Sequence, residues 1–370
     1  MTLRGARLTD AQRLDWLRLI RTEQVGPRTF RALINQFGSA AAALDALPDL
    51  ARRGGRGSSL HTPSRSACED ELAALSRLGG RLVVSNDSDY PPALRVLDDA
   101  PPILAVRGSA ALLAAPKVAI VGARNASAAG RTMAQRLARE IAEGGYAIVS
   151  GLARGIDAAA HAASLELGTI GVFAGGLARP YPPENIPLIE EIAAKGALVS
   201  EMPLAWEPRA RDFPRRNRLV SGMSLGVVVV EAAERSGSLI TARLAAEQGR
   251  EVFAVPGSPL DPRAGGSNKL LKSGATLVTE ASDVLDTLSP LLLHVPVGDM
   301  EAPAPPPARG APSEDARARI IELLGPVPTY PDEIVRLSGT DACEVQIVLL
   351  ELDLAGRLER HAGGAVSILP

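Results

Sequence analysis

Between residues 81 and 288, short runs of apolar residues alternate with longer segments whose apolar residues recur at helical spacing. Because the runs are continuously apolar, both faces of the sheet they form should be covered by helices. The pattern predicts an α/β fold with a doubly wound, Rossmann-like parallel sheet. The predicted strands are Lys117–Val121, Tyr146–Val149, Thr169–Phe173, Ala197–Val199, Gly226–Val230, Glu251–Val255 and Ala275–Val278. The predicted crossover helices are Gly130–Glu143, Arg154–Glu166, Asn185–Lys195 and Ser238–Gln248.

The two ends of the chain follow different patterns. Residues 10 to about 80 carry apolar residues at helical spacing, with a turn signal at Val25-Gly26-Pro27. Residues 296–312 hold six prolines among alanines, a composition typical of an extended, semi-rigid linker. We therefore predict four segments, which are a helical domain at 1–80, a Rossmann-like domain at 81–290, a linker at 291–313 and a final domain at 314–370.

The final domain has the pattern of a small winged helix. Three helices are predicted, followed by two short strands joined by Gly363-Gly364. Between residues 342 and 369 the only arginines or lysines are Arg357 and Arg360, and four acidic residues outnumber them. Duplex DNA requires a basic surface, so we expect this domain to bind protein rather than duplex DNA. The predicted helices are Ala316–Leu324, Asp332–Leu337 and Glu344–Leu354.

Composition and charge narrow the class of protein. The chain is 46% hydrophobic and 22% charged, with a net charge of -2, so an anionic partner must meet a local basic cluster. Cys68 and Cys343 are the only cysteines, which excludes a cysteine zinc site and a disulfide framework. We predict no metal or cofactor. No secretory signal or membrane-spanning run is evident, so we expect a cytoplasmic protein.

Ligands of open parallel sheets bind beyond the carboxyl ends of the strands, so the segments that follow the strands are the candidate sites. The first of these contains Gly122, Arg124 and Ser127 and lacks the GxGxxG pattern of dinucleotide sites. An arginine and a serine at the start of a helix suit an anion such as a phosphate within a longer chain. The alternative is an ordinary strand–helix turn whose arginine faces solvent.

The second candidate segment follows the strand that ends at Val149. Gly151 and Gly155 permit close approach of a ligand to the backbone. Asp157 and His161 are one helical turn apart and could form an acid–base pair, which would indicate an enzyme. Because no nucleophile or metal partner is evident nearby, a structural hydrogen bond is the favoured interpretation.

The densest basic cluster lies between residues 209 and 218. It holds five arginines in ten residues, with an aromatic ring at Phe213. Arginines bind phosphates bidentately, and an aromatic face can stack on an unpaired base. A solvated arginine face with Phe213 in the core is the alternative. The candidate contacts in this cluster are Arg211, Phe213, Arg215, Arg216, Asn217 and Arg218.

A further helix start could also hold an anion. Ser236, Gly237 and Ser238 lie between an apolar run and a helical segment, with hydroxyl groups on both sides of the glycine. A serine cap with no ligand is an equally good interpretation of this segment.

Together these segments resemble the DNA-processing protein A (DprA) family of bacterial recombination mediators. The resemblance rests on motifs in sequence order from about residue 117 to 270, including VGAR-x2-S, SGLARGID-x3-H, F-P-RRNR and SGSLITA. It implies a protein without known catalytic activity that binds single-stranded DNA regardless of sequence. It also implies DNA contacts at Gly122, Arg124, Arg211, Phe213 and the arginines that follow. Ala123 stands where the family commonly has serine or threonine, so a hydroxyl contact is absent here. We expect this absence to have a small effect on DNA binding.

The resemblance further implies partners. It implies a homodimer joined through the Rossmann-like domain and a role in loading RecA past single-strand-binding protein in natural transformation. The competing hypothesis is a nucleotide-binding or nucleotide-cleaving enzyme of a related fold, although its glycine-rich loop is matched only incompletely around Gly237. A nicotinamide-dependent oxidoreductase is disfavoured because neither GxGxxG nor the acidic ribose partner is in place.

Overall fold

The computed structural model describes residues 8–293 and 312–369. The chain forms two compact units. One consists of Asp70–Asp299, and the other combines the N-terminal segment up to Glu69 with the C-terminal segment from Met300 onward. The two ends, which we predicted as separate domains, both lie in this second unit. Most of the predicted linker at 291–313 lies outside the described residues.

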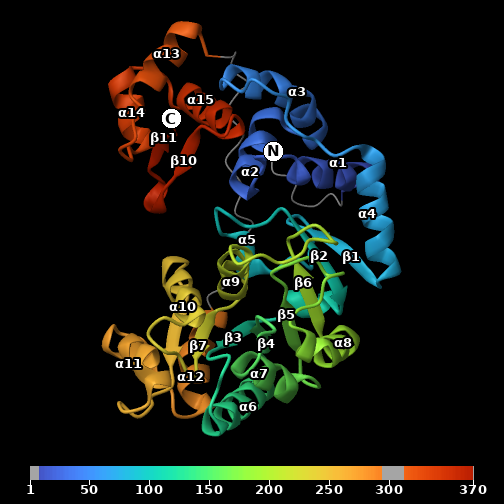
Figure 1. Ribbon diagram of the computed structural model, residues 1–370, viewed down its shortest axis with the longest axis vertical. Coiled ribbons are helices and arrows are strands. Elements are labelled where there is room, and N and C mark those ends of the chain that lie inside the picture. Colours follow the sequence, from blue (N-terminus) through green and yellow to red (C-terminus); the bar gives the residue numbers. More distant parts are fainter. Residues whose placement is uncertain (1–7, 294–311, 370) are drawn as a thin grey trace. The chain divides into compact units, whose positions relative to one another are not determined.

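The central unit is built on a nine-stranded sheet with the order β1-β2-β6-β5-β4-β3-β7-β8-β9 (Figure 1). All pairs from β6 to β9 are parallel, and β2 pairs antiparallel with both β1 and β6. The strands are β1 (Gly80–Val84), β2 (Ile103–Gly108), β3 (Lys117–Val121), β4 (Ala147–Ser150), β5 (Thr169–Val172), β6 (Ala197–Ser200), β7 (Gly226–Val229), β8 (Glu251–Ala254) and β9 (Thr276–Leu277). The doubly wound sheet and all seven predicted strands are confirmed. The antiparallel pair β1–β2 was not predicted.

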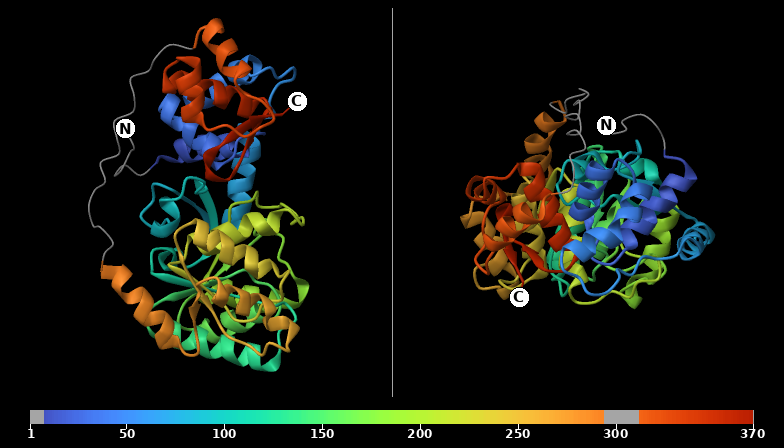
Figure 2. Two further views of the ribbon diagram at one scale, coloured as in Figure 1. Left: turned by 90° about the vertical axis from the view of Figure 1, so that its left-hand side faces the viewer. Right: turned by 90° about the horizontal axis from the view of Figure 1, so that it is seen from above.

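Helices cover both faces of this sheet, as the continuously apolar strands required. The helices are α4 (Arg65–Arg77), α5 (Pro92–Arg95), α6 (Ala128–Glu143), α7 (Ile156–Ser164), α8 (Ile186–Lys195), α9 (Asp212–Gly222), α10 (Gly237–Glu247), α11 (Gly265–Lys272) and α12 (Ala281–Leu293). Successive residues of β3 enter opposite cores, Ala119 with residues of α9 and α10, and Ile120 with residues of α6, α7 and α12. The helices α6 and α12 lie side by side on the second face (Figures 1 and 2).

The other unit contains three N-terminal helices and the winged helix. The helices are α1 (Asp10–Arg21), α2 (Pro27–Phe37), α3 (Ala40–Arg53), α13 (Glu314–Glu322), α14 (Pro331–Ser338) and α15 (Ala342–Leu354). The strands β10 (Leu358–Arg360) and β11 (Val366–Ile368) form the antiparallel wing. The three predicted helices and the hairpin of the final domain are therefore confirmed.

Two features are absent from the part of the chain that the structure describes. No helix within 8–293 or 312–369 is long and apolar enough to cross a membrane. In the same ranges no group of three or more His, Cys, Asp or Glu side chains could hold a metal ion.

Candidate nucleic-acid interface

The sheet reverses its winding direction at β3, since the chain adds β4 on one side of β3 and later β7 on the other. The segments that follow these three parallel strands therefore meet at one edge of the sheet. A crevice at such a switch point is the usual binding position in open α/β sheets. The segments in question are the predicted ones that begin at Gly122, Gly151 and Glu231.

The first segment packs closely against its neighbours. A Cβ at Gly122 would lie 2.6 Å from the Ile156 side chain, so the turn after β3 requires glycine. Ser127 caps α6 by accepting a hydrogen bond from the Gly130 amide (2.9 Å). The amide of Ser127 donates to the Glu231 carboxylate at 3.0 Å, and its hydroxyl donates to the same carboxylate. The anion position predicted at this helix start is thus taken by a side chain of the protein itself.

The second segment is held by Asp157, which accepts hydrogen bonds from the amides of Gly151 (3.1 Å) and Ala153 (3.3 Å). Gly155 has a φ of +79°, a left-handed conformation that favours glycine. The next amide, of Ile156, donates to the Ala123 carbonyl at 3.2 Å. This bond ties the segment after β4 to the segment after β3.

His161 is fully buried, and its Nδ1 lies 2.7 Å from the Thr169 hydroxyl. Burial, together with the nearby positive charge of Arg216, lowers the pKa of His161 to about 3. Burial raises the pKa of Asp157, and the charge of Arg216 opposes that change. Asp157 thus binds backbone amides and His161 binds Thr169, in place of the structural hydrogen bond between the two side chains that was the favoured interpretation.

Arg216 is buried beneath the rim, with 6% of its surface exposed. Its Nη1 donates to the carbonyl of Val172 (2.6 Å) and to that of Gly151, and Nε donates to Asn217. Burial lowers the pKa of Arg216 to about 10, and Asp157 opposes the change. A Cβ at Gly151 would lie 2.7 Å from this guanidinium group. Arg216 therefore supplies a buried positive charge at the floor of this edge of the sheet. Its hydrogen bonds also connect the carboxyl ends of β4 and β5.

The other predicted arginines divide into paired and exposed groups. Arg215 and Arg218 both bind the buried carboxylate of Glu201, and Arg218 also donates to the Asp99 carbonyl at 2.7 Å. Arg211 is exposed at the start of α9. The predicted cluster is thus less available to a ligand than its sequence indicated.

The third predicted segment begins α10. The Ser236 side chain accepts from the Ser238 amide at 3.4 Å, and the two hydroxyls lie 2.7 Å apart. Asn217 donates to the Gly237 carbonyl at 3.3 Å, which connects α9 with this segment. Nothing would lie within 4 Å of a Cβ at Gly237, so its surface is open.

Phe213 and Arg124, which are far apart in sequence, lie together. The Arg124 guanidinium carbon is 5.4 Å from the centroid of the Phe213 ring, and that of Arg216 is 5.9 Å away. Tyr181 packs edge-to-face on Phe213, with ring centroids 6.0 Å apart. Arginine and aromatic side chains from the segments after β3 and β5 and from α9 therefore form one continuous surface.

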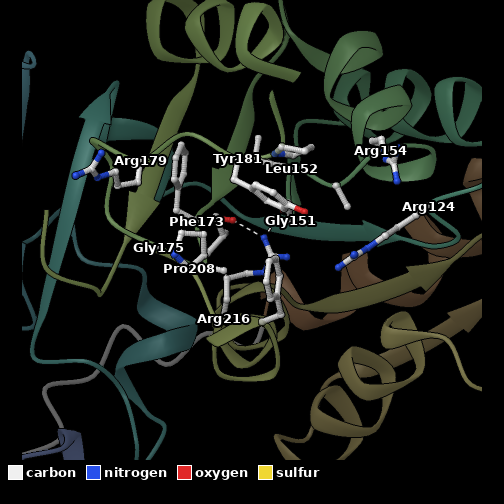
Figure 3. Close-up of a pocket in the computed structure, with 15 residues that line it drawn as sticks. Arg124, Gly151, Leu152, Arg154, Phe173, Gly175, Arg179, Tyr181, Pro208 and Arg216 are labelled. Carbon is white, nitrogen blue, oxygen red and sulfur yellow. Dashed lines mark hydrogen bonds between the residues drawn. The ribbon is translucent and has the colours of Figure 1, made fainter. Parts of the chain in front are cut away.

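These residues line a pocket at the carboxyl rim of the sheet (Figure 3). No acidic residue among those that the structure describes lines it. The lining includes four arginines and three aromatic residues, which are Arg124, Arg154, Arg179, Arg216, Phe173, Tyr181 and Phe213. In Figure 3, Arg216 lies in the middle near Tyr181, Arg124 and Arg154 lie on one side, and Arg179 lies at the opposite end. Arg154 and Arg179 have exposed acidic partners, Glu184 at 3.4 Å and Glu207 at 4.0 Å.

Sequence reasoning missed several of these residues. Arg154, Arg179 and Tyr181 occur in the segments after β4 and β5, but no spacing signal distinguished them from ordinary loop residues. Their position after parallel strands was the available signal. A second, wider hollow shares Arg124 and Arg154 with the pocket and adds Arg131 of α6.

Fold and pocket together define an α/β protein with a cationic, aromatic binding pocket at the carboxyl rim of its sheet. Residues 81–289 match the family described as DNA recombination-mediator protein A, which is more than half of the chain. Residues 10–74 match the DprA-like N-terminal HHH domain and residues 302–364 the DprA winged helix domain. The chain belongs to the DprA family.

Individual relatives agree with this assignment. The DNA processing protein DprA of Bacillus subtilis is 46% identical over 220 residues, covering 59% of this chain and 74% of that protein. The solved structure of DprA from Streptococcus pneumoniae has a TM-score of 0.62 at 34% identity and covers 76% of this chain and 98% of that one. A Helicobacter pylori DprA structure, described for its single-stranded DNA binding mode, has a TM-score of 0.51 at 35% identity, with coverages of 54% and 93%.

The buried His161 should make stability depend on pH. Between its folded pKa of about 3 and the ordinary 6.5, the unfolded chain binds a proton that the folded protein does not. The stabilisation present above pH 6.5 is therefore lost as the pH falls, by about 2 kcal/mol between pH 6.5 and 5. Urea unfolding of wild type and His161→Gln at several pH values tests this. An equally steep loss of stability in the variant would contradict the assignment.

Loss of Arg216 should weaken the fold as well as the pocket. Arg216→Ala leaves Asp157 and two carbonyls without their buried partner, which should cost about 3–5 kcal/mol in the free energy of unfolding. Arg211→Ala, at an exposed position nearby, should cost less than about 1 kcal/mol. Chemical denaturation measures both, and equal losses would show that Arg216 has no structural role.

Proposed function

We propose that this protein binds single-stranded DNA without sequence preference at the carboxyl rim of its sheet. The observation that carries the proposal is the pocket lined by four arginines and three aromatic rings without an acidic residue. Arginine favours phosphate, and an aromatic face favours an unpaired base. In a protein with a net charge of -2, this local surface is where a polyanion is best accommodated.

The aromatic residues are suited to an unstacked base. Tyr181 is 48% exposed, and its ring contacts that of Phe213, which is partly buried. Bases in a duplex already stack on each other, whereas each base of a single strand has free faces. We therefore assign stacking to Tyr181 and Phe213 and phosphate contacts to Arg124 and Arg211.

The remaining predicted residues take supporting roles in this proposal. Gly122, Gly151 and Gly155 allow the close packing that forms the pocket, and Arg216 supplies buried positive charge. Ser127 positions the first segment through Glu231. Arg215 and Arg218 hold α9 on Glu201, while Asn217 connects α9 with Ser236, Gly237 and Ser238 at the start of α10.

A polymer fits this surface better than a mononucleotide does. The hollow that shares Arg124 and Arg154 with the pocket is wider than the pocket and open to solvent. Its lining adds Arg131 and Gln135 of α6, together with the carboxylates of Glu184 and Glu191. A strand that enters the pocket can therefore place its neighbouring phosphates along this hollow. The Helicobacter pylori relative, described as binding single-stranded DNA, supports the same choice.

Membership of the DprA family supports a wider role in recombination. We propose that the protein forms a homodimer through the Rossmann-like unit and loads RecA onto single strands covered by single-strand-binding protein. We propose that this role serves natural transformation. We also propose that the protein acts in the cytoplasm. We further propose that the protein acts by binding and not as an enzyme.

Salt dependence tests the binding mode. Affinity for oligo-dT should fall steeply with salt, each neutralised phosphate contributing about -0.7 to the slope of log K against log salt. Arg124→Ala should reduce both affinity and slope, because a phosphate contact is lost. Arg77→Ala, an exposed arginine at the end of α4, is the matched control and should change neither. Fluorescence anisotropy measures these values, and a salt-independent affinity would contradict the proposal.

Removing an aromatic ring should have a different signature. Phe213→Ala and Tyr181→Ala should each weaken binding by about 1–3 kcal/mol while leaving the salt slope unchanged, because stacking involves no phosphate charge. The same anisotropy titrations measure this. A changed slope with unchanged affinity in low salt would place these rings away from the bases.

A nucleotide-cleaving enzyme remains the competing hypothesis, because the arginine and aromatic side chains of the pocket would also suit one nucleotide. Incubation of the protein with nucleoside monophosphates, followed by chromatography, should show no hydrolysis. Affinity should also rise from a mononucleotide to dT20. Turnover that is lost in Arg124→Ala would replace the binding proposal with the enzymatic one.

The RecA role requires its own assay. Wild-type protein should accelerate RecA-dependent strand exchange on DNA that is covered by single-strand-binding protein, and Arg124→Ala should not. Failure of the wild type in this assay, with normal binding of oligo-dT, would remove the RecA assignment and leave DNA binding intact.

A further inference from the structure

The winged helix packs on the N-terminal helices through α15, the second helix of its helix-turn-helix. In DNA-binding members of this class, the second helix is the one that enters the major groove. Here α15 contacts α13, α14 and β10 of its own domain and also α2 and α3. Both views in Figure 2 show the C-terminal elements in red beside the N-terminal helices in blue.

The sequence of α15 provides two apolar faces. Val345, Val348, Leu349 and Leu352 belong to the core of the winged helix. Ile347, Leu350 and Leu354 are also buried, at 7%, 3% and 0% exposure, but lie outside that core cluster. Their spacing of three and four residues places them along a second stripe of the helix. A helix that is apolar on two sides requires a second partner, and α2 and α3 are the neighbours that remain.

The backbones of α3 and α15 approach each other closely at Gly54, which makes the contact between them specific. Gly54 caps α3 with an ordinary helical conformation, φ -68° and ψ -6°, so its backbone alone does not require glycine. A Cβ added there would overlap the carbonyl group of Glu351 and lie 2.9 Å from the Cβ of Ala355. The contact with α15 is therefore what excludes a side chain at this position.

Polar contacts fix the same interface. The Thr29 hydroxyl of α2 donates to the Asp353 carboxylate at 2.8 Å, and Arg357 donates to the Gly54 carbonyl at 3.2 Å. The second basic residue of this region, Arg360, binds Asp353 at 3.4 Å. Both arginines of residues 342–369 are thus engaged within the protein, where a duplex reader would present them to phosphates.

We propose that the winged helix of this protein is the docking partner of its own N-terminal helical domain and is not a reader of duplex DNA. The apolar second stripe of α15 provides the binding energy, and Gly54 and Thr29 fix the position. The docking joins the two ends of the chain, which lie before and after the central unit in the sequence, into a single body. We expected the final domain to bind protein, and the N-terminal helical domain is the partner proposed here.

The test uses the full chain with a protease site inserted within residues 300–311. After cleavage, the fragment that contains the winged helix should co-elute with the remainder in gel filtration at low protein concentration. Separate elution of the wild-type fragment would overturn the proposal, whatever the variants do.

Two variants make the test specific. Gly54→Leu should cause loss of co-elution, because its side chain cannot fit against Glu351. Gly57→Leu is the matched control, since nothing lies within 4 Å of a Cβ at that position, and it should preserve co-elution. Circular dichroism verifies that both variants retain the wild-type helix content. If Gly54→Leu were to lose helix content, Thr29→Val and Arg357→Ala would be combined instead to weaken the interface. Full retention of the fragment in folded Gly54→Leu, or in the combined Thr29→Val and Arg357→Ala variant, would refute docking at this surface.

Discussion

The hydrogen bonds of the buried Arg216 guanidinium hold the candidate binding surface together. One side chain of α9 connects the carbonyls that end β4 and β5, faces Asp157 and lies beside the Phe213 ring. A charge buried in this way is costly unless several partners compensate it. The compensation comes from groups at the carboxyl rim of the sheet, so the same contacts that stabilise the charge also place it under the pocket.

The rim therefore combines two kinds of positive charge. Arg216 is fixed, buried and bound to the backbone, whereas Arg124 is exposed and rests on the same aromatic ring. Fixed charge attracts a polyanion without an ordering cost, and an exposed arginine can adjust to phosphates at different positions. Binding that depends on backbone charge and on base stacking, with no contacts to base edges, carries no sequence information.

Much of this arrangement was predictable, because the strands β3 to β9 are marked by continuous apolar runs and the rim segments by their glycines. The roles of individual polar residues were less predictable, because they depend on partners distant in the sequence. Ser127 was expected to hold an anion, but Glu231, more than 100 residues later, occupies that position. Arg215 and Arg218 were expected to face a ligand, yet Glu201 binds both. Likewise, the excess of apolar residues in α15 was visible, but its second partner, α3, lies near the opposite end of the chain.

The central claim is that a single strand lies across the arginine and aromatic residues at the carboxyl rim. Photo-cross-linking with a bromodeoxyuridine-substituted oligonucleotide, followed by mass spectrometry of the peptides, locates the bases directly. The account predicts cross-links to Tyr181 and Phe213. Cross-links confined to peptides remote from this rim, such as those of α12, would contradict it.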